Sequence, residues 1–324
     1  MKRFLRRAGL VLLVVLLGCG LFVLAARSGW LRPDDKDLRA RYGLSGSQYV
    51  TIGGQELHLV EEGSGPAVIL VHGSYGSLRM WNEWADRLKR RYRVIRFDRP
   101  GMGLSGPNGD ARYDGDAEAE LIGKLADHLK LTRFTLVGTS SSGEGAAHFA
   151  ALHPERIDAV ILANIAAGPL VMHPQQRSAM FKVAAMVDPW LKGWHSQALW
   201  RGVLETNYVD KAKVTPELVR EWTELNNRTQ GWPRKPWPSG KPFSGTPDDL
   251  AAIKAPTLLL WSDRDPETPV EVDGRRALAL LASTDKALVT IPDCGHMMPQ
   301  ECGPQSAVAA ATFLDRLHFG ETKP

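Results

Sequence analysis

The chain has 324 residues, of which 44% are hydrophobic, and this suits one α/β domain with an insertion rather than two independent domains. The net charge of +4 comes from the N-terminus, because residues 1–32 hold six basic side chains and no acidic one. Beyond them, 34 basic residues face 36 acidic ones, so the body is slightly acidic. This charge distribution does not indicate nucleic-acid binding, and we expect no nucleic-acid partner.

The N-terminal segment contains an uncharged apolar run from Ala8 to Ala26. As a helix this run would be roughly 28 Å long, close to the hydrocarbon thickness of a bilayer. The cations that precede it predict a signal anchor over residues 1–32, with the N-terminus in the cytoplasm and the body on the extracytoplasmic side, periplasmic or external. Other interpretations remain open: cleavage after Val23-Leu24-Ala25, lipoprotein processing at Cys19, or a buried globular helix. Residues 33–46 are predicted to form a polar stalk.

Two cysteines lie beyond this segment, Cys294 and Cys302. In an oxidising compartment they could form a disulfide that pins the loop between them. Two free thiols are the alternative, since the sequence does not supply the Cβ geometry that a disulfide needs.

In the body, short apolar runs alternate with helical patterns. A hairpin is expected from Tyr49 to Glu61, around Gly53-Gly54, and two of the helices are expected at Ala117–Leu129 and Gln305–Leu317. Further strands are expected at Ala67–Val71, Tyr92–Phe97, Phe134–Val137, Ala159–Ala163, Thr257–Trp261 and Ala287–Ile291. Continuous apolar strands that alternate with helices predict a mostly parallel sheet with helices on both faces and ligands at the carboxyl ends of the strands.

The alternation stops between Asn164 and Ala255, which suggests an insertion. We expect a helical cap at 165–250 and a core formed by 47–164 and 251–324. Thr215 followed by Pro216 marks the start of one cap helix, and a Pro-rich stretch runs from Gly231 to Pro247. Six of the ten tryptophans fall in this insertion: Trp190, Trp194, Trp200, Trp222, Trp232 and Trp237.

The segment from Phe134 to Gly145 reads FTLVGTSSSGEG, an apolar strand that breaks into a helix through a tight, Ser/Gly-rich turn. Ser140 would be the tip of a nucleophile elbow of the G-x-S-x-G type. Gly138 fills the first glycine position, but Ser142 stands at the second and Gly143 follows it. A turn without chemistry is the alternative for this segment taken alone.

Candidate partners of Ser140 follow two later strands. After Thr257–Trp261 come Asp263 and Asp265, either of which could be the acid of a triad, and after Ala287–Ile291 comes His296. The order Ser, acid, His is that of an α/β-hydrolase triad.

Backbone amides could supply an oxyanion hole for a tetrahedral intermediate. The strand Ala67–Val71 runs into His72-Gly73-Ser74, so the N–H groups of Ser74 and Ser141 are the candidate donors. His72 is interpreted as a residue that holds this loop rather than as a second base.

Over about residues 47–318 the chain resembles the α/β-hydrolase superfamily. Five stretches carry the resemblance: Leu70–Ser74, Phe97–Ser105, Gly138–Gly143, Trp261–Pro266 and Gly295-His296. It implies that Asp265 is the acid, because Asp265 precedes Pro266, and that Asp98 and Arg99 brace the loop beside the site. Two residues depart from the family pattern, Ser142 and Ser262, each in place of a glycine. Ser142 would add bulk at a tight contact of the following helix.

The resemblance implies a serine hydrolase of the esterase-like branch that cleaves a small-molecule carboxylic ester or lactone through an acyl-enzyme on Ser140. C–C bond hydrolysis and cofactor-free perhydrolysis on the same fold remain alternatives, as does a ligand-binding protein without catalysis. Candidate pocket residues are Tyr75, Thr139 and Met297. Neither a metal-ligand spacing nor a nucleotide-binding glycine loop occurs, so no cofactor and no metal are expected, and the sequence leaves the oligomeric state open.

Overall fold

The computed structural model describes residues 2–171, 175–228 and 242–320 of the chain. Eight strands form one sheet in the order β1-β2-β4-β3-β5-β6-β7-β8, in which β2 pairs antiparallel with both β1 and β4 and all other neighbours pair in parallel. The strands are β1 (Gln48–Ile52), β2 (Gln55–Glu62), β3 (Ala67–Val71), β4 (Arg93–Phe97), β5 (Phe134–Thr139), β6 (Ile157–Ala163), β7 (Thr257–Ser262) and β8 (Lys286–Ile291). The predicted fold class, a mostly parallel α/β sheet, is therefore confirmed.

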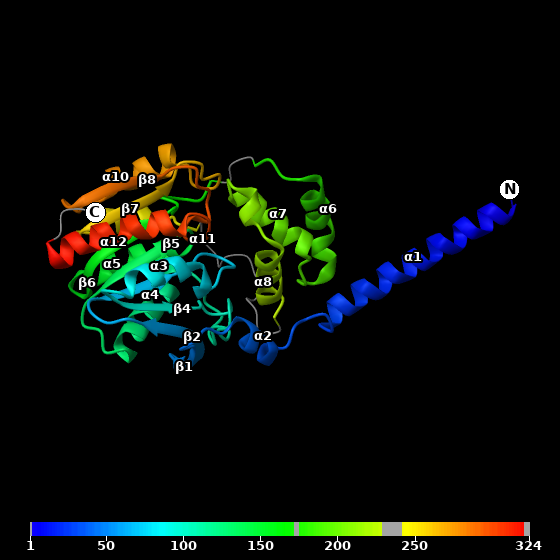
Figure 1. Cartoon of the computed structure of the whole chain (residues 1–324), viewed down its shortest axis with the longest axis horizontal. Coiled ribbons are helices and arrows are strands. Elements are labelled where there is room, and N and C mark those ends of the chain that lie inside the picture. Colours follow the sequence, from blue (N-terminus) through cyan, green and yellow to red (C-terminus); the bar gives the residue numbers. More distant parts are fainter. Residues whose placement is uncertain (1, 172–174, 229–241, 321–324) are drawn as a thin grey trace.

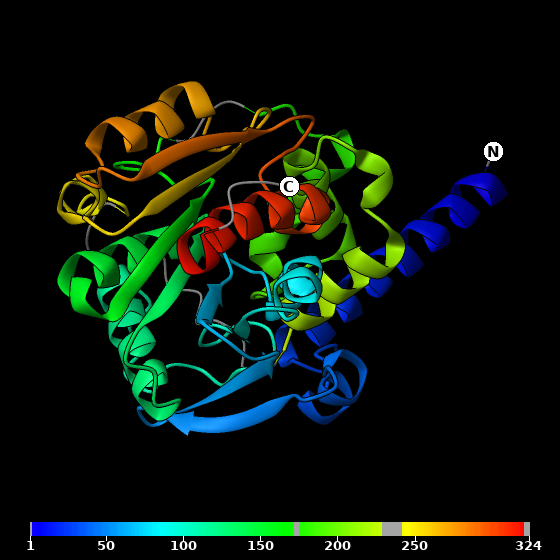
Figure 2. The same ribbon diagram turned by 60° about the vertical axis from the view of Figure 1, so that its left-hand side comes forward.

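Helices cover both faces of the sheet (Figure 2). On β3, Ile69 and Val71 pack into the core formed with α4 (Gly115–His128), α5 (Ser142–Leu152), α9 (Thr246–Ala252) and α10 (Arg275–Leu280). The alternate residues, Val68 and Leu70, face α3 (Asn82–Leu88) and α12 (Gly303–Phe319). Because β3 is buried on both faces, its sequence is a continuous apolar run without a polar position.

Between β6 and β7 the described residues form a helical cap over the carboxyl edge of the sheet (Figure 1). The cap contains α6 (Ala179–Val187), η3 (Asp188–Leu191), α7 (Gln197–Asn207), η4 (Lys211–Lys213) and α8 (Pro216–Asn226). The helix α8 begins as its sequence predicts, since Thr215 accepts a hydrogen bond from the Leu218 amide. Its buried side chains form a small core of their own with Trp200, Leu204, Tyr208 and Val214. Trp232, Trp237 and most of the Pro-rich stretch lie outside the described residues.

Shorter elements complete the core between the main strands and helices. They are η1 (Leu78–Trp81), η2 (Pro154–Arg156), η5 (Val270–Gly274) and α11 (Met298–Glu301).

The N-terminal helix α1 (Lys2–Ser28) extends away from the body (Figure 1). Its segment Arg6–Ser28, with a mean hydropathy of 2.8, is long and apolar enough to cross a membrane. A polar stalk was expected to follow it, but residues 33–46 contain the helix α2 (Asp35–Tyr42), which is packed on the body. Leu38 and Tyr42 are buried there against Leu104 and Leu225.

Candidate active site

Ser140 lies at the tip of the turn between β5 and α5. Its φ is 52°, in the left-handed region that a non-glycine residue adopts only where the surrounding structure enforces it. Its amide donates to the Ala163 carbonyl at 3.0 Å, which ties the turn to the end of β6. Gly73 approaches so closely that a Cβ there would lie 3.0 Å from Cβ of Ser140. The turn therefore has the geometry of a nucleophile elbow, with Ser140 beside the loop that follows β3.

Ser142, in the family's glycine position, is fully buried and bonded within the elbow. Its Oγ accepts from the Thr139 amide at 2.9 Å and lies 2.8 Å from the Val71 carbonyl oxygen, to which it can donate. The closest approach to the segment that follows β6 occurs instead at Gly143, where a Cβ would lie 2.1 Å from Cγ2 of Ile165. The bulk expected to disturb helix packing at Ser142 is therefore accommodated, and Gly143 is the position that requires a glycine.

His296 joins Ser140 to Asp265. The Nε2 atom of His296 lies 2.8 Å from Oγ of Ser140, and its Nδ1 atom lies 2.9 Å and 2.8 Å from the two oxygens of Asp265. Asp265 also accepts hydrogen bonds from the amides of Glu267 and Thr268 and from the Thr268 hydroxyl. The other candidate acid, Asp263, is exposed and accepts from the Cys294 amide. The three residues predicted as a triad thus form one hydrogen-bonded chain.

Two carboxylates act on the ionisation of His296. Burial lowers its pKa, but Asp265 and Glu267 outweigh burial and raise the pKa to about 9. Glu267 lies 3.3 Å from Nε2, the same nitrogen that meets Ser140, and its side chain is 37% exposed. Sequence reasoning did not single out Glu267, although it lies two residues beyond Asp265.

The candidate oxyanion residues meet through their side chains. The Ser74 hydroxyl donates to Oγ of Ser141 at 2.8 Å, and the Arg99 guanidinium donates to the same oxygen at 2.9 Å. Arg99 is buried and paired with Glu118, whose pKa is raised to about 7 by burial against the opposing effect of Arg99. A buried cation therefore fixes the residue that follows Ser140, beside the predicted oxyanion hole.

His72 and Asp98 hold the two loops behind this site. His72 donates from Nδ1 to the Gly73 carbonyl and accepts the Arg99 amide at Nε2, and burial lowers its pKa to about 4. A neutral histidine with both ring nitrogens hydrogen-bonded to backbone groups supports the loop and does not act as a base that faces substrate. Asp98 accepts from the amides of Leu78 and Leu104 and contacts His58 at 2.7 Å.

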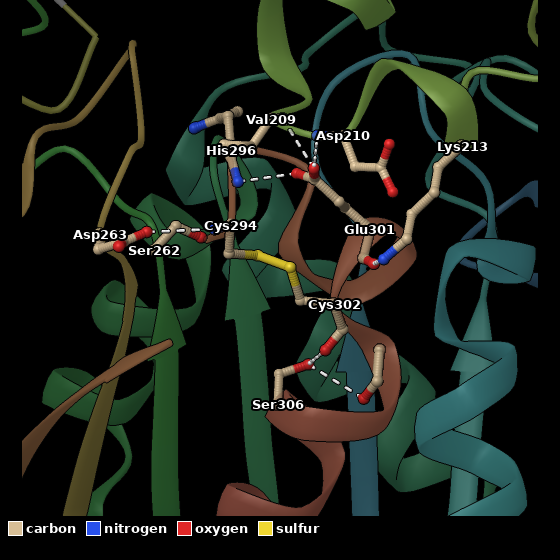
Figure 3. The surroundings of a disulfide bond; sticks show 12 residues. Val209, Asp210, Lys213, Ser262, Asp263, Cys294, His296, Glu301, Cys302 and Ser306 are labelled. Atoms are coloured by element: carbon tan, nitrogen blue, oxygen red, sulfur yellow. Dashed lines mark hydrogen bonds between the residues drawn. A yellow bond between two sulfur atoms is a disulfide. The ribbon is translucent and has the colours of Figure 1, made fainter. Parts of the chain in front are cut away.

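Glu301 supports the loop that carries His296 from behind and was missed by sequence reasoning. One of its oxygens accepts from the amide of Gly295, the residue before His296, at 2.7 Å. The other accepts from the amides of Val209 and Asp210 in the cap, each at 2.7 Å. One buried carboxylate thus bridges the histidine loop and the cap (Figure 3).

The disulfide that the sequence left open is formed between Cys294 and Cys302, which flank this bridge (Figure 3). Among the described residues, these two sulfurs and Glu301 are the one group close enough to hold a metal ion. Because the sulfurs are bonded to each other, they are not available as thiolate ligands.

Ser262, the second departure from the family pattern, takes part in a buried network at the end of β7. Its amide donates to Asn164, and the Asn164 side-chain amide donates to Oγ of Ser262 and to the His296 carbonyl. Ser262 therefore helps to hold Asn164, whose side chain binds the backbone of His296.

The three candidate pocket residues lie in different surroundings. The Tyr75 ring packs against Trp200 of the cap with centroids 5.2 Å apart, and Met297 packs on the cap core. Thr139 is 1% exposed, and its backbone amide and carbonyl are bonded to Ser142. Tyr75 and Met297 thus lie where the cap meets the core, whereas Thr139 lies inside the elbow.

The parallel sheet, its cap and the serine at a strand-to-helix turn define a hydrolase of the α/β-hydrolase fold. Residues 68–311 match the model of the alpha/beta hydrolase family, so the chain belongs to this family.

Several known proteins are similar to this chain. A 2-hydroxy-6-oxononadienedioate/2-hydroxy-6-oxononatrienedioate hydrolase from Comamonas testosteroni is 29% identical, over 77% of this chain and 90% of the relative. The crystal structure of a membrane phospholipase A is similar over 98% of this chain and 100% of its own, with a TM-score of 0.66 and 26% identity. A carboxylesterase from Bacillus subtilis has the same fold, with a TM-score of 0.70 and 20% identity over 91% of this chain and 98% of its own.

Proposed function

We propose that the protein is a serine hydrolase that cleaves carboxylic esters through an acyl-enzyme on Ser140. The observation that carries this proposal is the continuous hydrogen-bonded chain from Asp265 through His296 to Ser140, which stands at a strained elbow. A hydroxyl needs such a base beside it to act as a nucleophile at neutral pH.

The mechanism follows from the hydrogen bonds. His296 accepts the hydroxyl proton of Ser140 at Nε2 while Asp265 stabilises the imidazolium through Nδ1–H. Ser140 attacks the ester carbonyl, and the amides of Ser74 and Ser141 bind the resulting oxyanion. His296 then protonates the leaving alcohol. A water molecule, deprotonated in turn by His296, releases the carboxylic acid and restores Ser140.

The sequence and the comparisons support ester hydrolysis in two ways. The structure of a membrane phospholipase A matches 98% of this chain, whereas that of a meta-cleavage product hydrolase from Pseudomonas fluorescens matches 83%. In addition, the loop after β3 reads Ser74-Tyr75-Gly76-Ser77 rather than the glycine-richer sequence usual in C–C hydrolases.

Turnover of p-nitrophenyl esters of increasing acyl length by the full chain in detergent tests this proposal. We expect the wild type to hydrolyse them and Ser140→Ala to lose at least 10³-fold in kcat, since the triad acts as a unit. A fluorophosphonate probe should label the wild type and not the variant. Activity of Ser140→Ala near the wild-type level would refute the assignment, and a wild type that neither reacts with the probe nor turns over any ester would point to a ligand-binding protein.

C–C bond hydrolysis is the second candidate, because curated relatives at 28–29% identity are named as hydrolases of this kind. Loss of the absorbance of a dienoic diketo acid would report it. A kcat/KM for this substrate above that for every ester would replace the ester assignment. Perhydrolysis would be detected as peracid formation from the same esters in hydrogen peroxide.

We propose further that α1 is an uncleaved signal anchor that holds the body on the extracytoplasmic side. The four cations that precede the apolar run, against two that follow it within residues 1–32, and the disulfide in the body support this orientation. Mass spectrometry of the purified protein should detect the intact N-terminal peptide, and protease added to spheroplasts should digest the body. A mature N-terminus after Ala25 or at Cys19 would exclude the uncleaved anchor.

A further inference from the structure

The outer side of the cap carries apolar side chains that the body leaves uncovered. The helix α6 buries only Phe181, which packs against Gly202 of α7. Its other large apolar residues, together with one from η3, are exposed: Met180, Val183, Met186, Val187 and Trp190. We call these five side chains the cap apolar face. Met186 and Trp190 are each 69% exposed, and such a grouping on a soluble surface usually marks an interaction site.

The cap apolar face adjoins the end of α1. The ring of Phe22 in α1 meets Trp194 edge to face with centroids 5.3 Å apart. Arg27 donates to the Trp190 carbonyl, and the Trp194 indole donates to the Leu31 carbonyl. The segment that continues α6 is therefore attached to the helix that is apolar enough to cross a membrane (Figure 1).

The position of this contact along α1 sets how deep the cap would lie in a bilayer that α1 crosses. Phe22 precedes the end of the apolar run at Ala26 by four residues, about 6 Å along a helix. Helices that lie in a membrane interface bury their apolar face by ~5–10 Å. If α1 crosses a bilayer, the residues that contact Phe22 lie at the boundary between headgroups and acyl chains. Trp30, just beyond α1, is 83% exposed at the same end of the helix, where tryptophan is enriched in membrane proteins.

The charges around the face also suit a lipid surface. In residues 175–200 the one acidic side chain, Asp188, is bonded to His195 at 2.6 Å. The cations of this segment are Arg177, Lys182 and Lys192. Lysine side chains beside an apolar helix face can reach anionic headgroups while the apolar side chains enter the lipid.

We propose that the cap apolar face is a membrane-docking surface that lies in the headgroup region of the bilayer that α1 crosses. The cap over the active site would then receive acyl esters that partition into that bilayer. The docking rests on the proposed anchor, and the substrate class rests in addition on the proposed ester hydrolysis.

A fluorescent label on the face tests the docking directly. In the full chain carrying Cys19→Ser, Met186→Cys is labelled with an environment-sensitive fluorophore. Glu155→Cys is labelled as the control, because Glu155 is 67% exposed in η2, next to the amino end of β6 and away from the cap. Both proteins are reconstituted into liposomes of phosphatidylcholine and phosphatidylglycerol, with and without a quencher attached to the lipid acyl chain.

We expect the label at 186 to shift its emission to the blue and to be quenched from within the lipid, and the label at 155 to do neither. Equal, water-like emission from both labels would overturn the proposal. A blue-shifted label at 186 that the lipid quencher does not reach would also overturn it, in favour of a contact with a second copy of the chain.

A second measurement separates docking from chemistry. Val183→Glu/Met186→Glu should reduce hydrolysis of a long-chain ester held in the liposomes at least tenfold and should change hydrolysis of a dissolved short-chain ester less than twofold. Equal effects on the two substrates would contradict the role of the face in substrate delivery. Absence of wild-type activity on both esters would refute the ester assignment and leave the result of the labelling experiment intact.

Discussion

Glu301→Gln tests whether a residue with no direct contact to Ser140 controls the site. The carboxylate accepts three amide hydrogen bonds, one from the histidine loop and two from the cap. A glutamine of the same size has one oxygen and one NH2 group. Whichever way it turns, at least one buried or partly buried backbone amide faces a donor instead of an acceptor.

The magnitude follows from the lost bond. A buried polar group left without its partner costs ~1–3 kcal/mol. Unfolding entropy is about 2.1 cal/mol/K per residue, so for a body of roughly 290 residues 1 kcal/mol shifts Tm by about 1.6 °C, and we expect Glu301→Gln to melt ~2–5 °C below the wild type. Because Gly295 precedes His296, its displacement should also misplace the base. Errors of about 1 Å in an active site can cost ~100-fold, and we expect kcat to fall ~10–100-fold.

Thermal unfolding and ester turnover of the full chain in detergent measure both effects. Glu271→Gln is the matched control, since Glu271 is an exposed glutamate paired with Arg275 four residues away. We expect the control to melt within about 1 °C of the wild type, because exposed ion pairs contribute little. A Glu301→Gln variant with the melting temperature and kcat of the control would refute this account of the bridge.

Four further perturbations test other parts of the site. The Glu267 carboxylate helps to raise the pKa of His296, and His296 must be neutral to act as a base. Glu267→Gln should therefore move the acidic limb of the kcat/KM profile to lower pH, by roughly 0.2–0.7 unit for a solvent-screened pair. A limb that stays in place or moves to higher pH would contradict the geometry. Ser142→Gly restores the family glycine but removes the hydroxyl that pairs with the Thr139 amide and the Val71 carbonyl. It should therefore lower the free energy of unfolding, measured in urea, by ~1–3 kcal/mol. A more stable variant would refute this account. Gly143→Ala should lower the free energy of unfolding further, because its Cβ would lie 2.1 Å from Cγ2 of Ile165. The disulfide links residues eight positions apart, and its loss should lower the free energy of unfolding by about 2.5 kcal/mol through loop entropy. Reductant should therefore lower the Tm of the wild type and leave the Tm of the double cysteine-to-serine variant unchanged.

The residues expected to form a triad could be found in the sequence because each follows an apolar strand. Ser140, Asp265 and His296 come after β5, β7 and β8, and the carboxyl ends of parallel strands meet at one edge. Between Asp263 and Asp265, the strand position alone could not decide. The family resemblance favours Asp265, and the structure agrees, since Asp265 faces His296 and Asp263 faces the Cys294 amide.

The supporting residues carried no comparable signal. Glu301 bonds to amides about 90 residues away in the cap, and nothing in its neighbouring sequence indicates those partners. Arg228 is equally buried, donating to the Gly103 and Ser105 carbonyls and pairing with Asp35. The polar composition of the α2 sequence predicts a stalk. Its two buried residues, four apart on one helix face, are the pattern that could have revealed its packing.

The short connection after α1 has a consequence for how the protein would search for substrate. Arg32 donates to the backbone carbonyls of Lys192 and Arg228, and Asp35 pairs with Arg228, so this connection is bonded to the cap at several points. A body held this way cannot swing on a flexible tether. If α1 crosses a bilayer, Ser140 keeps one height and one orientation above it. Encounters with substrate would then be set by lateral diffusion in two dimensions rather than by the reach of a linker.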